Sequence, residues 1–174
     1  MVEANSLALR TSLRLFAGFA VAPPAAVLLA LATYNLLWHL GLLSGGAPID
    51  SIYAATPLGI GVGVIAVVMT FAAVPPIAWL ASRGPVSFGK VILLGAALGN
   101  LPFALIVLGV VAAHPFREIL SGDIGRFWYG VSGAAQRVAI GLASGMGAAS
   151  LFWIVGIRGT AVQRGDHRFS LRHG

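Results

Sequence analysis

The fold is decided by the stretch PLGIGVGVIAVVMTFAAVPPIAWLA, residues 57–81, which contains no charged side chain. A bilayer core of about 30 Å is crossed by about 20 helical residues, and this stretch is longer than that. It must be helical, because an isolated strand in lipid would leave its backbone N–H and C=O groups without partners. Residues 57–81 are therefore predicted to form a transmembrane helix.

Three further apolar runs have the same character and cover residues 15–43, 91–113 and 138–157. The whole chain is 58% hydrophobic and 9% charged, whereas a soluble domain carries about 25% charged residues. So few charges cannot cover a surface that faces water. The sequence predicts an all-α polytopic membrane protein with four transmembrane helices, which form a single membrane domain over residues 1–174.

The positions of arginine and lysine predict the orientation of these helices. Basic residues gather in the N-terminal segment 1–14, in the connection 82–90 and in the C-terminal tail 158–174. These segments hold Arg10, Arg14, Arg83, Lys90, Arg158, Arg164, Arg168 and Arg172, whereas the other connections hold Arg117, Arg126 and Arg137. Because basic loops stay in the cytoplasm, both termini are expected to be cytoplasmic. Basic residues beside apolar runs are topology signals, so the net charge of +6 does not indicate nucleic-acid binding.

The connection between the third and fourth spans, residues 114–137, is the only long one. Its segment HPFREIL, residues 114–120, has a proline at a helix start, and Gly122 follows as a stop signal. Phe127, Trp128 and Tyr129 then stand just before the fourth span, as aromatic side chains at the headgroup level do. This connection is predicted to lie on the outer membrane surface with a short interfacial helix.

Paired prolines recur in two similar segments, FAVAPPAAVL at residues 19–28 and FAAVPPIAWL at residues 71–80. Each pair removes two amide donors and frees carbonyls four residues earlier. Helix kinks are predicted at Pro23, Pro24, Pro75, Pro76 and Pro102. Two alternatives stay open: the freed carbonyls line a cavity or bind a cation, or Pro23 begins the first span after a basic surface helix over residues 5–16.

Glycines at helical spacing mark predicted packing faces on the last two helices. Gly95 and Gly99 form one such face on the third helix, and Gly141, Gly145 and Gly147 form others on the fourth. Helices in lipid gain little from apolar burial against each other, so close backbone approach matters more. These faces are expected to pack within the bundle, with contact to another subunit as the alternative.

Polar residues that could carry chemistry are few. No ionisable residue lies deep in a predicted span, which argues against an ion-coupled transporter or a proton pump. Asn100 is the deepest polar residue and is expected to bond across to another helix. His39 and His114 are the weak cofactor candidates, because two histidines at similar depth can hold haem iron or a metal. An outer polar cluster is predicted from Asn35, Asp50, Glu118, Asp123 and Arg137.

The chain has no cysteine, and we find no nucleotide-binding or hydrolase motif. The sequence therefore predicts no catalytic residue and no specific cofactor. The leading hypothesis is an accessory or assembly subunit of a membrane complex, with lipids and other membrane subunits or further copies as partners. The alternatives are a small oligomeric transporter or channel-like protein, and a haem- or metal-binding redox protein using His39 and His114. The composition, rich in arginine, alanine, glycine and proline, favours a bacterial source and hence the cytoplasmic (inner) membrane.

Overall fold

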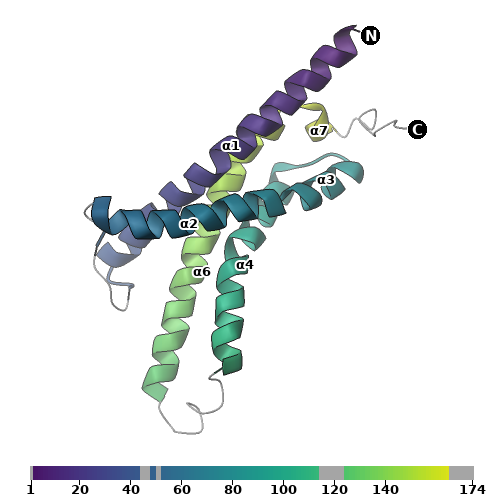
Figure 1. Ribbon diagram of the computed structural model, residues 1–174. Coiled ribbons are helices and arrows are strands. Elements are labelled where there is room, and N and C mark those ends of the chain that lie inside the picture. Colours follow the sequence, from purple (N-terminus) through teal and green to yellow (C-terminus); the bar gives the residue numbers. More distant parts are fainter. Residues whose placement is uncertain (1, 44–47, 50–51, 114–123, 165–174) are drawn as a thin grey trace.

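The computed structural model describes residues 2–43, 48–49, 52–113 and 124–164, and within these it contains helices and no strand (Figure 1). The helices are α1 (Val2–His39), α2 (Ile52–Ala72), α3 (Val74–Ser82), α4 (Phe88–Ala113), α6 (Ile124–Phe152), the π-helix η1 (Trp153–Ile157) and α7 (Ala161–Arg164). The predicted all-α class is confirmed. Among the described residues, Leu9–His39, Gly59–Ser82 and Gly133–Ile157 are long and apolar enough to cross a membrane.

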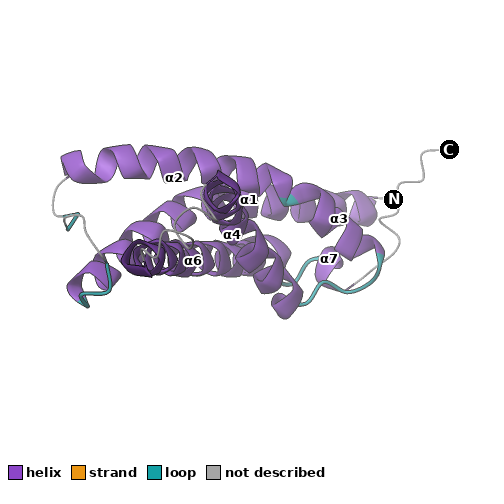
Figure 2. Cartoon of the chain, turned by 90° about the horizontal axis from the view of Figure 1, so that it is seen from below, coloured by secondary structure: helices purple, strands orange, loops and turns teal. Residues whose placement is uncertain are grey.

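The helices form two groups that differ in direction. α4 and α6 lie side by side and run antiparallel, and α1 packs along α6 and η1 (Figure 1). α2 and α3 follow each other in one line that is steeply inclined to α4 and α6, as both views show (Figures 1 and 2). α2 is attached to the rest mainly through α1, so the bundle is tight on one side and open on the other.

The tight side depends on backbone contact between α4 and α6. A Cβ atom added to Gly99 would lie 2.8 Å from the Cα of Gly145, and one added to Gly145 would lie 2.9 Å from the Cα of Gly99. A Cβ added to Gly95 would lie 2.5 Å from the carbonyl oxygen of Gly145, and one added to Gly99 would collide with the carbonyl oxygen of Gly141. Only glycine lets two helices approach so closely. The structure thus turns these predicted packing residues toward each other within one chain.

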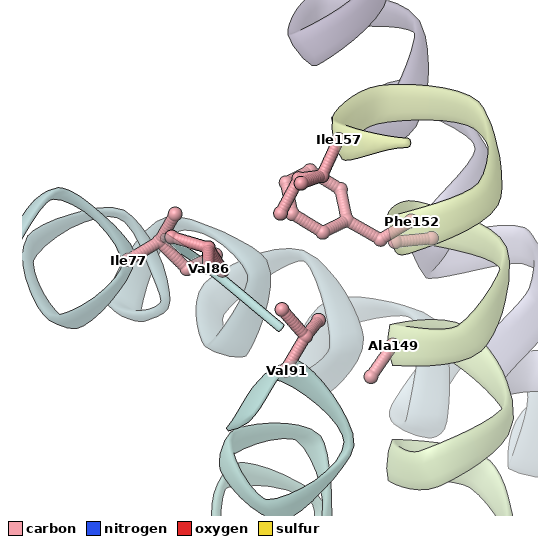
Figure 3. Packing of buried hydrophobic residues seen from close by; sticks show 7 residues of the cluster. Ile77, Val86, Val91, Ala149, Phe152 and Ile157 are labelled. Carbon is pink, nitrogen blue, oxygen red and sulfur yellow. The ribbon is translucent and has the colours of Figure 1, made fainter. Parts of the chain in front are cut away.

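A small core sits at the end of the bundle where α3, α4 and η1 meet. It contains Ala22, Ile77, Val86, Val91, Ala149, Phe152 and Ile157, most of which are labelled in Figure 3. The ring of Phe19 on α1 lies against that of Phe152, with 4.6 Å between centroids. A Cβ on Gly18 would lie 2.8 Å from the Phe152 ring, so α1 approaches α6 closely at the glycine.

The first helix ends earlier than predicted, at His39 rather than at Leu43. Gly41 has a φ of +68°, in the left-handed region that favours glycine. Its N–H donates to the carbonyl of Trp38 at 2.9 Å, and the N–H of Leu42 donates to that of Leu37 at 2.9 Å. This pair of bonds is the Schellman motif, which ends a helix after an apolar run without needing a polar residue.

The last helix begins earlier than predicted. α6 starts at Ile124, so residues 124–137, which the sequence analysis assigned to a surface loop, are the first turns of a helix, and that part of the prediction is wrong. Arg126 and Arg137 interrupt the apolar run but not the helix, because arginine is a good helix former. The short helix predicted at residues 114–120 lies outside the described residues.

The two proline pairs have different consequences. α1 runs without a break through Pro23 and Pro24, and α4 likewise continues through Pro102. The second pair instead stands in the first turn of α3, directly after the α2 helix ends. The N–H of Ala73 is shared between the carbonyls of Met69 at 2.9 Å and Thr70 at 3.2 Å. Proline is tolerated in a first turn because its missing N–H would have no helical partner there.

Replacement of Gly145 by alanine tests the α4–α6 crossing. The new Cβ would collide with the carbonyl oxygen of Gly95 and force the backbones apart, so Gly145→Ala is expected to destabilise the protein by about 2 kcal/mol. Gly133→Ala is the matched control on the same helix, because a Cβ there meets nothing within 4 Å. It is expected to be neutral or to stabilise by up to about 1 kcal/mol. Reversible unfolding in detergent measures both, and equal effects would contradict the crossing.

Candidate functional site

A partly open cavity of about 120 Å³ lies where α1, α2, α3, α4 and α6 converge. Aliphatic side chains, alanines and glycines form most of its wall, including Ala26, Ala66, Leu98 and Gly99. The cavity exists because α2 diverges from α4, while α4 and α6 stay in contact at their glycines.

The two hydroxyl groups in the cavity wall are directed to their own helices. Thr70 donates to the carbonyl of Ala66 at 2.7 Å, and Ser144 donates to that of Ile140 at 2.8 Å. Serine and threonine commonly bond to the preceding helical turn in this way. A polar ligand would lose water here without gaining a free donor, which costs free energy. The cavity therefore fits an apolar chain.

α2 presents two opposite faces. One face lines the cavity with Val62, Ala66, Met69 and Thr70, which recur at helical spacing. The opposite face exposes large apolar side chains, namely Ile60, Val64, Val68 and Phe71. Near this outward face, a Cβ on Gly61 would meet nothing within 4 Å.

The three basic segments meet at one end of the molecule, which we call the basic end (residues 10–14, 83–90 and 158–164). Nε of Arg14 donates to the carbonyl of Val155 at 3.2 Å, and Nη1 of Arg14 lies 3.4 Å from the position of a Cβ on Gly159. The N–H of Val86 donates to the carbonyl of Val162 at 3.4 Å. The structure therefore joins α1, the α3–α4 connection and the residues after η1.

The end of the last long helix explains why Arg14 bonds to a main-chain carbonyl. Its final turn is the π-helix η1, after which the N–H of Arg158 donates to the carbonyl of Trp153 at 2.8 Å. The N–H of Gly159 donates to Oε1 of Gln163, and that of Thr160 donates to the carbonyl of Ile157. The carbonyl of Val155, in the last turn, therefore stays available to the guanidinium of Arg14. Arg14, which the sequence marks as a topology signal, thus also makes a contact between helices.

Two other basic side chains lie exposed beside the α3–α4 connection. The guanidinium of Arg83 lies 4.0 Å from the ring centroid of Trp79, a cation–π contact. Nζ of Lys90 donates to the carbonyl of Pro85 at 3.2 Å. Neither contact uses all the donors of these groups. The remaining N–H donors of both groups are therefore available to a further acceptor.

At the opposite end, amide side chains hold the α1–α2 connection. Nδ2 of Asn35 donates to the carbonyl of Ile49 at 3.2 Å, and the N–H of Ile49 donates to Oδ1 of Asn35 at 2.9 Å. Nε2 of Gln136 on α6 donates to the carbonyl of Leu42 at 2.6 Å. Asn35, predicted as part of an outer polar cluster, thus has a loop-holding role, and Gln136 shares it.

The other residues of the predicted outer sites are only partly described. His39 is exposed and its ring stands edge-on to Trp38, with 5.1 Å between centroids. Arg137 is also exposed. The remaining members, His114, Asp50, Glu118 and Asp123, lie outside the described residues, so the shared histidine site stays a prediction. Within the described part of the chain, no three His, Asp or Glu side chains are grouped to hold a metal ion.

Asn100 bonds within its own helix rather than across to another. Its Nδ2 donates to the carbonyl of Ala96 at 2.9 Å. Its Oδ1 and the Nε1 of Trp153 are buried without a hydrogen-bond partner among the described residues.

Comparison with known protein families, with curated proteins and with solved structures finds no match to this chain.

Sequence reasoning missed three features of these sites: the cavity, the Arg14–Val155 bond and the role of Gln136. Gln136 carried a usable signal, since an amide next to an apolar run commonly bonds to a neighbouring segment. The cavity and the Arg14 bond carried none, because they depend on the angle between helices and on the residue at which the last long helix ends.

Removal of the Arg14 donors tests the junction at the basic end. Arg14→Met keeps the apolar stem but loses the bond to Val155, and it is expected to destabilise the protein by about 1 kcal/mol. Amide hydrogen exchange over residues 155–164 is expected to become faster. Arg10→Met is the control, because Arg10 is equally exposed and lies one turn earlier on the same helix. Unchanged exchange in Arg14→Met, or equal acceleration in Arg10→Met, would contradict a specific junction.

Proposed function

We propose that this chain is a four-span membrane protein with cytoplasmic termini, and that it serves as an accessory or assembly subunit that packs against other subunits of a membrane complex. The observation that carries the subunit role is the unpaired outward face of α2, defined by Ile60, Val64, Val68 and Phe71.

The meeting of both chain ends supports four crossings. Arg14 contacts Val155, and Val86 contacts Val162, so residues near the start, middle and end of the chain share the basic end. Leu42 contacts Gln136 at the opposite end. The chain therefore runs from the basic end to the opposite end and back twice, which makes four passages. The third passage is α4, so α4 is proposed to cross the membrane as well. α4 has 26 residues, or about 39 Å of helix, which exceeds a bilayer core.

The poor burial of α2 supports a partner. Of the most apolar part of each candidate span, 28% is buried in Leu9–His39 and 17% in Gly133–Ile157, but only 11% in Gly59–Ser82, which covers most of α2 and all of α3. Helices in a membrane associate through close packing. The outward face offers large side chains with open space beside Gly61, where a neighbouring helix can approach.

The hydroxyl groups on the described helices bond to their own backbone, which agrees with a packing role. The hydroxyls of Thr70, Ser144 and Ser150 each donate to a carbonyl one turn earlier in the same helix. Catalysis requires groups aimed at a substrate, whereas these groups are committed to the backbone. The proposal therefore assigns the chain a role in assembly rather than a reaction.

Crosslinking in native membranes tests the subunit role. The chain has no cysteine, so Phe71→Cys and Leu93→Cys each carry a single thiol at a position that is 72% exposed. After attachment of a photoactivatable thiol reagent, Phe71→Cys is expected to give a discrete band that contains a second protein, at several times the yield of Leu93→Cys. A purified chain that is monomeric, forms no such band and has an activity of its own would overturn the proposal.

A small oligomeric transporter is a second candidate, favoured by one observation. The break at Ala73, just before Pro75 and Pro76, lies at the wall of the cavity, which Thr70, Ala73 and Ile77 help to line. Substitution of Pro75 and Pro76 by alanine is expected to straighten this break and to change flux of an apolar solute in proteoliposomes. Flux that does not differ from empty liposomes would remove this candidate.

A further inference from the structure

Two residues of the cavity wall, Ile77 and Val91, flank in sequence the connection that carries the exposed cations Arg83 and Lys90. We propose that the cavity holds part of an acyl chain of an anionic phospholipid, and that Arg83 and Lys90 bind the phosphate of the same lipid. This inference rests on the chain's being embedded in a bilayer, and it does not depend on a partner subunit.

The cavity has the chemistry and size for part of an acyl chain. Its hydroxyls, on Thr70 and Ser144, are bonded to their own helices, so the wall offers only apolar contact. Its volume is about 120 Å³, close to that of an engineered apolar cavity of about 150 Å³ that binds benzene. A few methylene groups fill such a space, and the open side lets the rest of the chain continue into the bilayer.

The cations stand where the headgroup of that lipid would be. Val91 lines the cavity, and Lys90 directly precedes it in the first turn of α4. Side chains on a helix lean toward its N-terminus, so the side chain of Lys90 leans toward the start of α4 and the α3–α4 connection. On the other side, Ile77 lines the cavity from α3, and Arg83 is the C-cap residue of that helix. Ile77, Val86 and Val91 belong to one buried cluster (Figure 3), and Arg83 and Lys90 lie in the segment of the chain that joins Ile77 to Val91.

Charge favours an anionic headgroup over a zwitterionic one. The segments 1–14, 82–90 and 158–174 contain the eight arginines and lysines named above but only Glu3 and Asp166 as acids. Arg83 rests on Trp79 and Lys90 on the carbonyl of Pro85, so both cations are held near the connection with donors to spare. A guanidinium and an ammonium at this level are suited to binding a lipid phosphate.

Native mass spectrometry of the purified chain tests the proposal directly. The protein is presented with equal amounts of phosphatidylglycerol and phosphatidylcholine that carry the same acyl chains. The wild type is expected to retain phosphatidylglycerol preferentially. Each basic residue near an anionic headgroup contributes about fivefold, so Arg83→Gln with Lys90→Gln is expected to reduce that preference about 25-fold. Arg137→Gln, an exposed arginine near the opposite end, is the control and is expected to leave it unchanged.

A second pair of variants tests the acyl chain separately. Ala66→Leu projects into the cavity from α2 and is expected to lower retention of both lipids, about fourfold for each methylene displaced. Ala72→Leu adds the same volume at an exposed position of the same helix and is expected to have no effect.

Several results would overturn the proposal. These are equal retention of the two lipids by the wild type, unchanged preference in the charge variant, unchanged retention in Ala66→Leu, or a second protein that fills the site and excludes lipid. The comparison of the two lipids on the wild type needs no substitution. Equal retention there would therefore contradict the proposal even if every variant misfolded. Failure of the crosslinking experiment would leave these measurements unaffected, which separates this inference from the subunit role.

Discussion

The contact between the backbones of α4 and α6 at Gly95, Gly99 and Gly145 is the constraint on which the rest of the structure depends. Glycine is required there by simple geometry, because a Cβ on any of the three would meet the main chain of the opposing helix. The contact holds α4 antiparallel to α6. It also positions the end of α6 and η1 against α1, where Gly18 meets Phe152 and Gly156. The basic end is assembled on this frame.

α4 and α6 pack closely against each other, whereas a partly open cavity lies between this pair and α2. α2 joins the frame mainly through α1 and is steeply inclined to the α4–α6 pair (Figure 1). Residues of α2 and the glycines of α4 therefore line the same cavity. The cavity and the outward face of α2 are two apolar surfaces that the other described helices do not cover. We assign the first to an acyl chain and the second to a partner helix. The cavity adjoins the cations of the α3–α4 connection, whereas the outward face is apolar over its length.

Much of the fold could be predicted from the sequence, because it follows from length and composition. Apolar runs indicated the helices, and glycine spacing indicated the faces that meet between α4 and α6. Helix ends were harder. Gly41 ends α1 through its backbone conformation, and α6 extends to Ile124 across two arginines that mark charge but not helix boundaries. The candidate site could not be predicted, because a cavity depends on the angles between helices and the Arg14 bond depends on where the last long helix ends.

We propose that the chain crosses a membrane four times and that its basic end faces the cytoplasm. Single cysteines at Ser87, in the exposed α3–α4 connection, and at Leu42, exposed after α1, report the two ends in a chain that has no other thiol. In intact cells, a membrane-impermeant maleimide is predicted to label Leu42→Cys and to leave Ser87→Cys unlabelled until the membrane is opened. Labelling of both positions from the same side, or of Ser87→Cys alone from outside, would contradict the account.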